Sequence, residues 1–301
     1  ICTMAGDTPS RGIAKQRSVS AAFGVSQSGE FVQYAVPERL TSSVFGKDNP
    51  PKDWADISLL VPHETIRREE QSMLASIDKL LELSKAKSVK SWQLLYFCEW
   101  YNGLFAPFIH EHHDIEERYY FPWLQTKVEI PEKQFAKGHE ALVAQLDEID
   151  GICKKVIKKQ GIDCDAEILD LHTKMHAFVP DMNEHLMEEE RDIPPLAREH
   201  FTEEEESKLV ESFAQKEFKL SVLRNVWPAV MEAIDAWGTP EQLQKMETTM
   251  PGFISKLAAK YWIPDYDNCI KPKRDAPFLD SEPIFKRVGC FGISFCFPCI
   301  L

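Results

Sequence analysis

The sequence predicts an all-α protein, an up-down four-helix bundle with a C-terminal helical extension and irregular N- and C-terminal arms. Two observations carry this prediction. Between residues 53 and 200, apolar residues recur at helical spacing in four long stretches. The links between these stretches are short, and each apolar stripe needs another to cover it, so the four helices are expected to pack together.

The four helical stretches are defined by their apolar stripes and by the residues that end them. They run from Ile66 to Leu81, from about Val89 to Pro122, from Phe135 to Gly161 and from Ile168 to Pro195. Pro107 and Pro180 lie inside the second and the fourth stretch, and a proline inside a helix predicts a kink there.

Three further segments flank this bundle of residues 53–200. Residues 1–52 are rich in Ser, Gly and Pro and predict an irregular arm, with one short strand between Glu30 and Val36. Residues 201–263 predict a helical extension, which opens at Thr202 as the N-cap before four glutamates. Residues 264–301 predict an irregular, apolar tail that contains cysteines.

Composition limits the class of protein. The 301 residues are 44% hydrophobic, which is ample for a packed core, and the net charge of −13 disfavours nucleic acid as a partner. No apolar run reaches the ~18 residues that a membrane-spanning helix needs. Cys98, Cys153 and Cys164 stand singly, which is typical of a cytoplasmic protein. The chain begins with Ile1, which is typical of a fragment or a processed chain.

The cysteines of the tail, Cys290, Cys296 and Cys299, stand among aromatic residues. Two interpretations remain open for this segment. S-acylation of the cysteines would bring the tail into contact with a membrane, whereas an unmodified tail would pack on the helical extension. The sequence does not indicate a protein partner.

A duplicated motif carries the chemistry. The pattern H-x-x-x-E-E-R begins at His112 and again at His185, and a proline follows ten residues after each of these histidines. A lone histidine precedes each copy, His63 by 49 residues and His139 by 46 residues. The bundle is therefore predicted to be a duplicated helix pair, in which each copy contributes one lone His and one His-x-x-x-Glu.

The spacing of four places His112 and Glu116 on one helix face, and the same holds for His185 and Glu189. These faces also carry the apolar stripes, so four histidines and two glutamates are expected to converge in the core. No Lys or Arg is expected on these stripes, and buried carboxylates without a partner are costly, so the sequence predicts bound cations. Six ligands suit two ions, and imidazole with carboxylate favours iron over manganese or zinc.

These motifs resemble the hemerythrin/HHE cation-binding family over roughly residues 56–200. The resemblance implies a non-haem di-iron centre, which an oxo group can bridge, and a protein that binds or senses iron, oxygen or both, rather than an enzyme. The ligands that it implies are His63, His112, Glu116, His139, His185 and Glu189. Oxygen-carrying members have a second histidine where this chain has Val143. The reduced set resembles the iron- and oxygen-responsive domains of some ubiquitin-ligase subunits.

Several alternatives stay open. His113 with Glu117 is a second register for the helix-two ligand pair, and Glu190 is an outside candidate where the last helix distorts. His172 and His176 are expected at the surface. Two other functions compete with metal sensing: a di-iron oxidoreductase that acts on O2, peroxide or nitric oxide, and a metal-free helical scaffold that binds a partner through residues 201–263.

Overall fold

The structure is a computed structural model of the whole chain. The residues that it describes are 23–25, 31–33, 40–46, 48–130, 132–217, 220–249 and 252–285. Residues from 286 onward, which include the three cysteines of the tail, lie outside the described residues, so neither interpretation of the tail is tested.

The chain divides into two compact units, residues 1–37 and residues 38–301. In the first unit, strand β1 (Phe23–Val25) pairs antiparallel with strand β2 (Phe31–Gln33). Strand β2 lies within the one strand expected in this arm. The second unit contains every helix described below.

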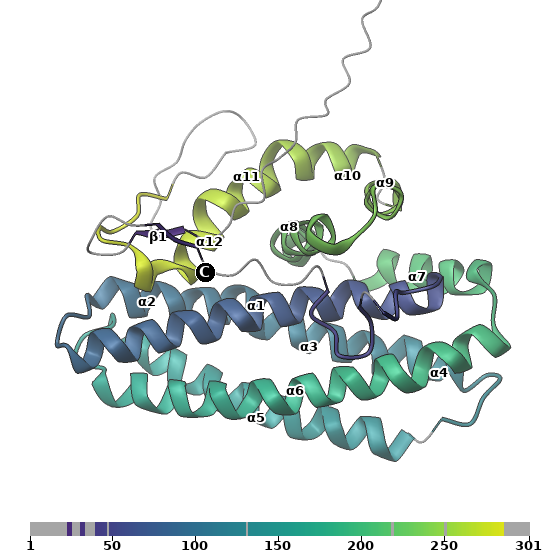
Figure 1. Ribbon diagram of the computed structural model, residues 1–301, viewed down its shortest axis with the longest axis horizontal. Coiled ribbons are helices and arrows are strands. Elements are labelled where there is room, and N and C mark those ends of the chain that lie inside the picture. The colour runs from purple at the N-terminus through teal and green to yellow at the C-terminus, as the bar shows by residue number, and fades with distance from the viewer. Residues whose placement is uncertain are drawn as a thin grey trace, which may run out of the picture. The chain divides into compact units, whose positions relative to one another are not determined.

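Four helical segments lie side by side along the length of this unit (Figure 1). Three of them are single helices: α1 (Trp54–Lys85), α5 (Glu132–Lys158) and α6 (Asp165–His200). The remaining segment is composite and runs through α2 (Ser91–Trp100), η1 (Tyr101–Phe105), α3 (Ala106–Ile115), η2 (Glu116–Tyr120) and α4 (Phe121–Leu124). Helix α1 contacts α6 and α2, and α5 contacts α6 and α2, so the four segments form a helical bundle.

Local sequence sets the ends of these segments. Asp53 caps α1, because its side chain accepts a hydrogen bond from the Ala55 backbone N–H at 3.1 Å. After α5 the chain turns through Gly161 at φ +70°, where a Cβ atom would lie 2.1 Å from the Ser91 carbonyl oxygen. Glycine is therefore required at this turn both by its conformation and by the close approach of α2.

Each π-helical segment in the described chain ends two residues before a proline. These segments are η1, η2, η3 (Ala258–Trp262) and η4 (Tyr266–Ile270), and the prolines are Pro107, Pro122, Pro264 and Pro272. Proline cannot donate to the carbonyl four residues back, and its ring clashes with that carbonyl. The wider π turn relieves this clash, so the composite segment passes Pro107 through a π turn rather than ending there. Helix α6 continues through Pro180 as one helix.

One half of the bundle has a fully apolar core. Phe97, Tyr101, Phe105 and Phe178 are completely buried there, together with aliphatic residues from all four segments. Phe105 meets Phe178 edge to face, with ring centroids 6.4 Å apart. These side chains lie on the stripes that the sequence assigns to the core, and their burial confirms that prediction.

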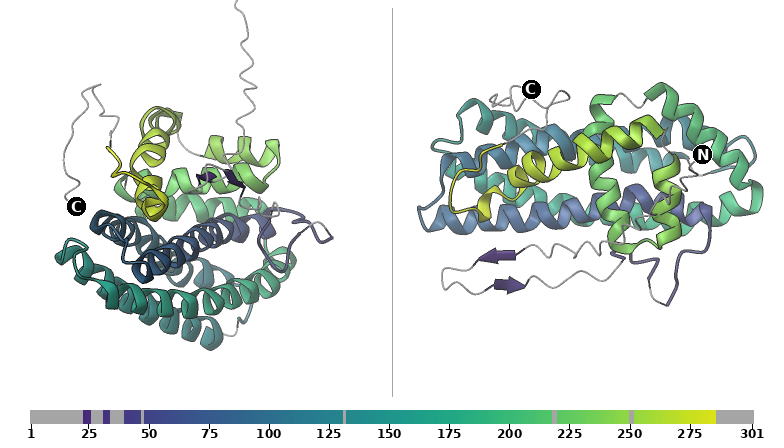
Figure 2. Two further views of the ribbon diagram at one scale, coloured as in Figure 1. Left: turned by 60° about the vertical axis from the view of Figure 1, so that its left-hand side comes forward. Right: turned by 90° about the horizontal axis from the view of Figure 1, so that it is seen from above.

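The extension begins with α7 (Glu203–Glu217), whose Thr202 cap exchanges hydrogen bonds with Glu205 as a capping box. Helix α8 (Leu220–Trp237) then packs across α1 (Figure 2). Its Val230, Ile234 and Trp237 form a buried cluster with Leu60 of α1. The remaining helices are α9 (Pro240–Thr249), α10 (Gly252–Leu257), α11 (Ile263–Asp265), α12 (Lys271–Arg274) and the 3-10 helix η5 (Ala276–Phe278).

Helical structure therefore continues beyond residue 264, where the sequence predicted an irregular tail. The repeated prolines of this region suggested irregular chain, but Pro264, Pro272 and Pro277 each lie in the first turn of a short helix, and a π turn precedes two of them. Tyr266 belongs to the buried core of the bundle, and its hydroxyl donates to Glu69 Oε1 on α1 at 2.7 Å, so this segment is held on the bundle. Within the described chain, no helix has the length and apolarity that a membrane crossing requires.

Candidate metal centre

The structure brings the six ligand candidates together in the core, between the aromatic half of the bundle and a second apolar cluster that contains Leu59, Phe121 and Ile193. His63 comes from α1, His112 from α3, Glu116 from the start of η2, His139 from α5, and His185 and Glu189 from α6. All six side chains are buried, with exposed fractions between 0% and 7%. Two sets of four ligand atoms drawn from them are each compact enough to surround one ion.

The two carboxylates divide this cluster into two subsites. In subsite one, His63 Nε2 lies 3.4 Å from Glu189 Oε2, and His112 Nε2 lies 3.5 Å from Glu116 Oε1. In subsite two, His139 Nε2 lies 3.6 Å from Glu116 Oε2, and His185 Nε2 lies 3.4 Å from Glu189 Oε1. Each carboxylate therefore turns one oxygen toward each subsite, which is the arrangement of a bridging ligand.

His113 joins subsite two, so the two registers considered for helix two are not exclusive. Its ring stacks on His139 with centroids 4.1 Å apart and meets His185 edge to face at 5.5 Å. Neither ring nitrogen of His113 has a hydrogen-bond partner, although the side chain is buried. His112 faces subsite one and His113 faces subsite two, because adjacent helical residues diverge by about 100°.

Two further carboxylates hold the lone histidines from behind. His63 Nδ1–H donates to Glu190 Oε1 at 3.0 Å, and His139 Nδ1–H donates to Glu117 Oε1 at 3.0 Å. The first Glu of each Glu-Glu pair thus faces the subsites, and the second orients the lone His of the other repeat. This contact leaves Nε2 of both imidazoles free to face an ion. The duplicated Glu-Glu pair was the sequence signal for these two supports.

One cation lies closer to the cluster than the sequence suggested. Arg67, one turn after His63 on α1, is buried and donates to Glu190 Oε1 at 2.7 Å. The expectation of no Lys or Arg on the stripe is therefore wrong for α1. The guanidinium pairs with Glu190 and not with Glu116 or Glu189, so the charge of the two central carboxylates remains to be balanced.

Residues 40–46, which we call the strap, cross α1 beside the cluster. The backbone N–H groups of Thr41 and Ser42 donate to the buried carboxylate of Glu64 at 2.9–3.0 Å. The Ser42 hydroxyl donates to Glu190 Oε2 at 2.5 Å. Glu190 is thus held by three donors, Ser42, Arg67 and His63, and the strap is linked through it to subsite one.

The central polar atoms lack hydrogen-bond partners. They are Nε2 of His63, His112, His139 and His185, both nitrogens of His113, and both oxygens of Glu116 and Glu189. Burying such groups without partners is costly, and a carboxylate costs more than an imidazole. One nitrogen of each of the five histidines and both carboxylates border the two subsites, so cations there would satisfy all of these atoms except the second ring nitrogen of His113.

Three of the histidines are electrically neutral. Burial lowers the pKa of His112 well below its usual value, and it lowers the pKa of His113 to about 2 and that of His185 to about 4. The charge of neighbouring histidines adds to this effect for all three. A neutral imidazole has a free lone pair, which is the form that binds a metal.

The other two histidines are controlled by carboxylates. Burial alone would lower the pKa of His139, but Glu189 and Glu116 outweigh it and raise the pKa to about 9. His63 behaves in the same way, since Glu116, Glu189 and Glu190 raise its pKa well above the usual value. Burial and the charge of Glu189 raise the pKa of Glu116 to about 7. Without an ion, protons on His63 and His139 are therefore what balance the carboxylates.

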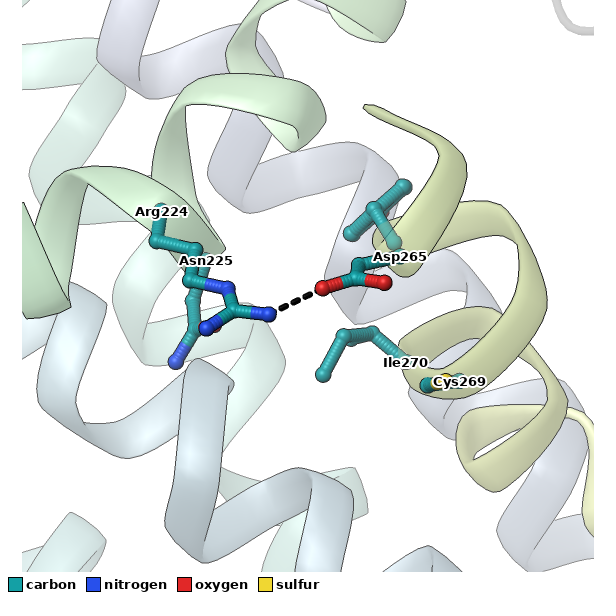
Figure 3. Close-up of a pocket in the computed structure, with 6 residues that line it drawn as sticks. Arg224, Asn225, Asp265, Cys269 and Ile270 are labelled. Atoms are coloured by element: carbon teal, nitrogen blue, oxygen red, sulfur yellow. Dashed lines mark hydrogen bonds and ion pairs between the residues drawn. The ribbon is translucent and has the colours of Figure 1, made fainter. Parts of the chain in front are cut away.

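The remaining histidines lie outside this cluster. His110 is partly exposed and lies 3.4 Å from Asp147, and His172 and His176 lie at the surface beside Asp78, as the sequence predicts. A small pocket between α8 and the C-terminal helices is lined by Arg224, which is paired with Asp265 (Figure 3). No residue of the two subsites lines this pocket.

Buried imidazoles and bridging carboxylates inside four packed helices define a helical cation-binding domain. Residues 61–197 match the family model of the hemerythrin HHE cation binding domain, so this part of the chain is a hemerythrin HHE domain. No curated protein and no solved structure matches the chain.

Proposed function

We propose that this protein binds two iron ions between its helices and uses their occupancy or state to sense iron, oxygen or both. The observation that carries the proposal is the division of the two carboxylates, since each of Glu116 and Glu189 offers one oxygen to each subsite. Subsite one would be completed by His63 and His112, and subsite two by His113, His139 and His185.

The donor set favours iron among the available metals. Five imidazoles and two carboxylates without a thiolate suit non-haem iron, whereas structural zinc sites are tetrahedral and commonly use cysteine. The described cysteines lie elsewhere, with Cys98 and Cys153 in the apolar half of the core. His113 would supply an imidazole to subsite two. The chain has Val143 where oxygen-carrying members have a further histidine.

The connections support an up-down arrangement of the four segments. Each segment packs against the next one in the chain, and α6 packs back on α1, which closes the ring. Short links at residues 86–90, 125–131 and 159–164 join consecutive segments and favour antiparallel neighbours. We propose that this is the arrangement that places one set of ligands on each segment.

Burial favours sensing over turnover of a large substrate. The ligands are almost inaccessible, so only an ion or a small molecule such as O2, peroxide or nitric oxide is expected to reach them. When bound, iron supplies redox chemistry and an affinity for such small molecules. Subsite one has four ligand atoms and subsite two has five, so the oxidoreductase alternative would act first at subsite one.

The test is reconstitution of the full chain with ferrous iron under anaerobic conditions, followed by a metal count and an absorption spectrum after exposure to air. The proposal predicts about two irons per chain and a ligand-to-metal absorption band. Manganese and zinc are offered in parallel samples, and preferential retention of either of them would overturn the assignment of iron.

Single variants at the two adjacent histidines separate the subsites. His112→Ala is expected to remove iron from subsite one, and His113→Ala to weaken iron binding at subsite two. His110→Ala, at a histidine that faces Asp147 instead, is the matched control and should retain both ions. Steady consumption of O2 or peroxide by the iron-loaded protein would favour the oxidoreductase over the sensor.

A further inference from the structure

A second group of metal-ligating side chains lies on the outside of the bundle. His172 and His176 stand one turn apart on α6, and Asp78 faces them from α1. His172 Nε2 lies 3.1 Å and His176 Nε2 lies 2.7 Å from the same oxygen, Asp78 Oδ1. One ligand atom from each residue falls within 4.8 Å of the other two.

This group is separate from the interior subsites. His172 precedes His185 by 13 residues on α6, and Asp78 follows His63 by 15 residues on α1. At the helical rise of ~1.5 Å per residue, the two groups lie about 20 Å apart along the bundle. No side chain belongs to both groups, so the outer group stands on its own geometry and does not depend on the function proposed above.

We propose that Asp78, His172 and His176 form a surface site for one divalent first-row transition-metal ion, and we take zinc as the representative ion. Two imidazoles four residues apart present their nitrogens on one helix face, and a carboxylate from the neighbouring helix completes a three-ligand set. Water would occupy the remaining position, because the three side chains are between 28% and 54% exposed.

A surface ion pair explains this geometry less well than a metal site. The two imidazole rings lie with their centroids 4.4 Å apart, and both approach the same carboxylate oxygen. Two protonated imidazoles at that separation repel each other, and an exposed ion pair contributes little to stability. A single metal ion between the three groups would take one ligand atom from each of them.

The position of this site gives its occupancy a structural consequence. Helices α1 and α6 carry His63, His185 and Glu189 toward the interior, and the outer site joins the same two helices. An ion that binds only the folded chain stabilises it by mass action, so the outer ion would fasten α1 to α6.

The experiment measures zinc bound by the full chain in equilibrium dialysis against zinc chloride, with elemental analysis of the protein. We expect the double variant His172→Gln/His176→Gln to bind one zinc fewer per chain than the unmodified protein. Asp78→Asn should weaken binding of that one zinc by tenfold or more, because it removes the charge but keeps the size of the side chain.

His110→Gln is the matched control, since it removes an exposed histidine that also faces one aspartate, and it should bind as much zinc as the unmodified protein. A parallel double variant at His112 and His185 tests independence and should still bind the outer zinc. The proposal is overturned if the unmodified protein and His172→Gln/His176→Gln bind equal amounts of zinc. It is also overturned if the zinc assigned to the outer site is lost from the double variant at His112 and His185 but not from His172→Gln/His176→Gln.

Discussion

The two ends of the bundle core are built from the same four helical segments and yet depend on different forces. At one end, Phe97, Phe105 and Phe178 fill the space between the helices, and the core is apolar. Toward the other end, and before a second, smaller apolar cluster, His63 and Glu189 occupy equivalent inward positions, and their central atoms lack partners. Apart from the π turns η1 and η2 in the composite segment, the four segments are α-helical. The main difference between the two ends is therefore which side chains the stripes carry.

In each helical segment, apolar side chains at one end stabilise the fold, and polar side chains toward the other end form the candidate metal site. Apolar contacts at the aromatic end stabilise the bundle whether or not an ion is present. The polar end offsets the cost of its buried carboxylates only by protonating histidines or by binding cations. Glu70, two turns after His63 on α1, lies in the layer between these ends.

The largest effect is expected at the aromatic end. Phe178→Ala should lower the free energy of unfolding by about 3–5 kcal/mol, since it opens a cavity in a fully packed core. The loss should be the same with and without added metal, as measured by urea unfolding. Leu169→Ala on the same helix is the control, because Leu169 is 55% exposed and its truncation should cost less than about 0.5 kcal/mol.

Glu116→Gln tests the polar end. Loss of a carboxylate that only orients a ligand usually weakens metal binding by about 10- to 100-fold. Glu116 is itself a proposed ligand, so the variant should weaken metal binding by more than about 100-fold. At pH 8 the metal-free variant should be at least as stable as the unmodified protein, because the ionised Glu116 is buried beside Glu189. Metal titration and urea unfolding measure the two quantities, with exposed Glu148→Gln as control. A metal-free variant much less stable than the parent would remove the contrast between the ends.

Glu190→Gln tests the supports behind the ligands. Its carboxylate orients His63, so the variant should weaken metal binding by about 10- to 100-fold, which is the usual effect of losing such a support. Glu117→Gln should act in the same way through His139 and at the other subsite. If neither variant changes metal affinity, the two carboxylates have no part in orienting the imidazoles.

Glu70 gives the intermediate layer a pH dependence. Burial raises the pKa of Glu70 to about 8, above its ordinary value of 4.5. The folded state thus keeps a proton that the unfolded state has lost, so this contribution is fully present below pH 4.5 and is lost as the pH rises through 8. This effect should lower the free energy of unfolding of the unmodified protein by on the order of 2 kcal/mol between pH 5 and 8. The decrease should be absent in Glu70→Gln, as measured by unfolding at each pH.

The smallest effect is expected at the strap. Ser42→Ala removes one of three donors to Glu190 and should cost about 1 kcal/mol of stability, since the hydroxyl is partly exposed. Metal affinity should fall by less than it does in Glu190→Gln. Ser43→Ala, at the exposed neighbour, is the control. An effect of Ser42→Ala as large as that of Glu190→Gln would show that the strap governs the orientation of Glu190.

The sequence predicted the bundle and the meeting of the six ligand candidates, because each depends on spacing along a helix. His63, His112 and His185 needed only the rule that residues on an apolar stripe face the core. The prediction left His112 and His113 as alternatives, because a helical wheel gives one inward face per helix. With two subsites in the core, adjacent residues can face different ions.

Other features depend on contacts between distant segments, which spacing does not reveal. The pairing of Glu190 with His63 joins residues 127 positions apart, and Arg67 of α1 also donates to Glu190. The strap of residues 40–46 acts through hydroxyl and backbone groups, which have no periodic signature. Helical structure past residue 264 was missed because its prolines were interpreted as breaks rather than as the ends of π turns.

The central claim is that bound cations stabilise the polar end of the core. Its most direct test is the free energy of unfolding of the metal-stripped full chain, measured anaerobically before and after ferrous iron is added at about 100 times its dissociation constant. The account predicts a rise of about 2.7 kcal/mol for each iron bound, and so about 5.4 kcal/mol for two irons, that is absent in the double variant His112→Ala/His185→Ala. Unchanged stability with no iron, manganese or zinc retained by the unmodified protein would contradict it.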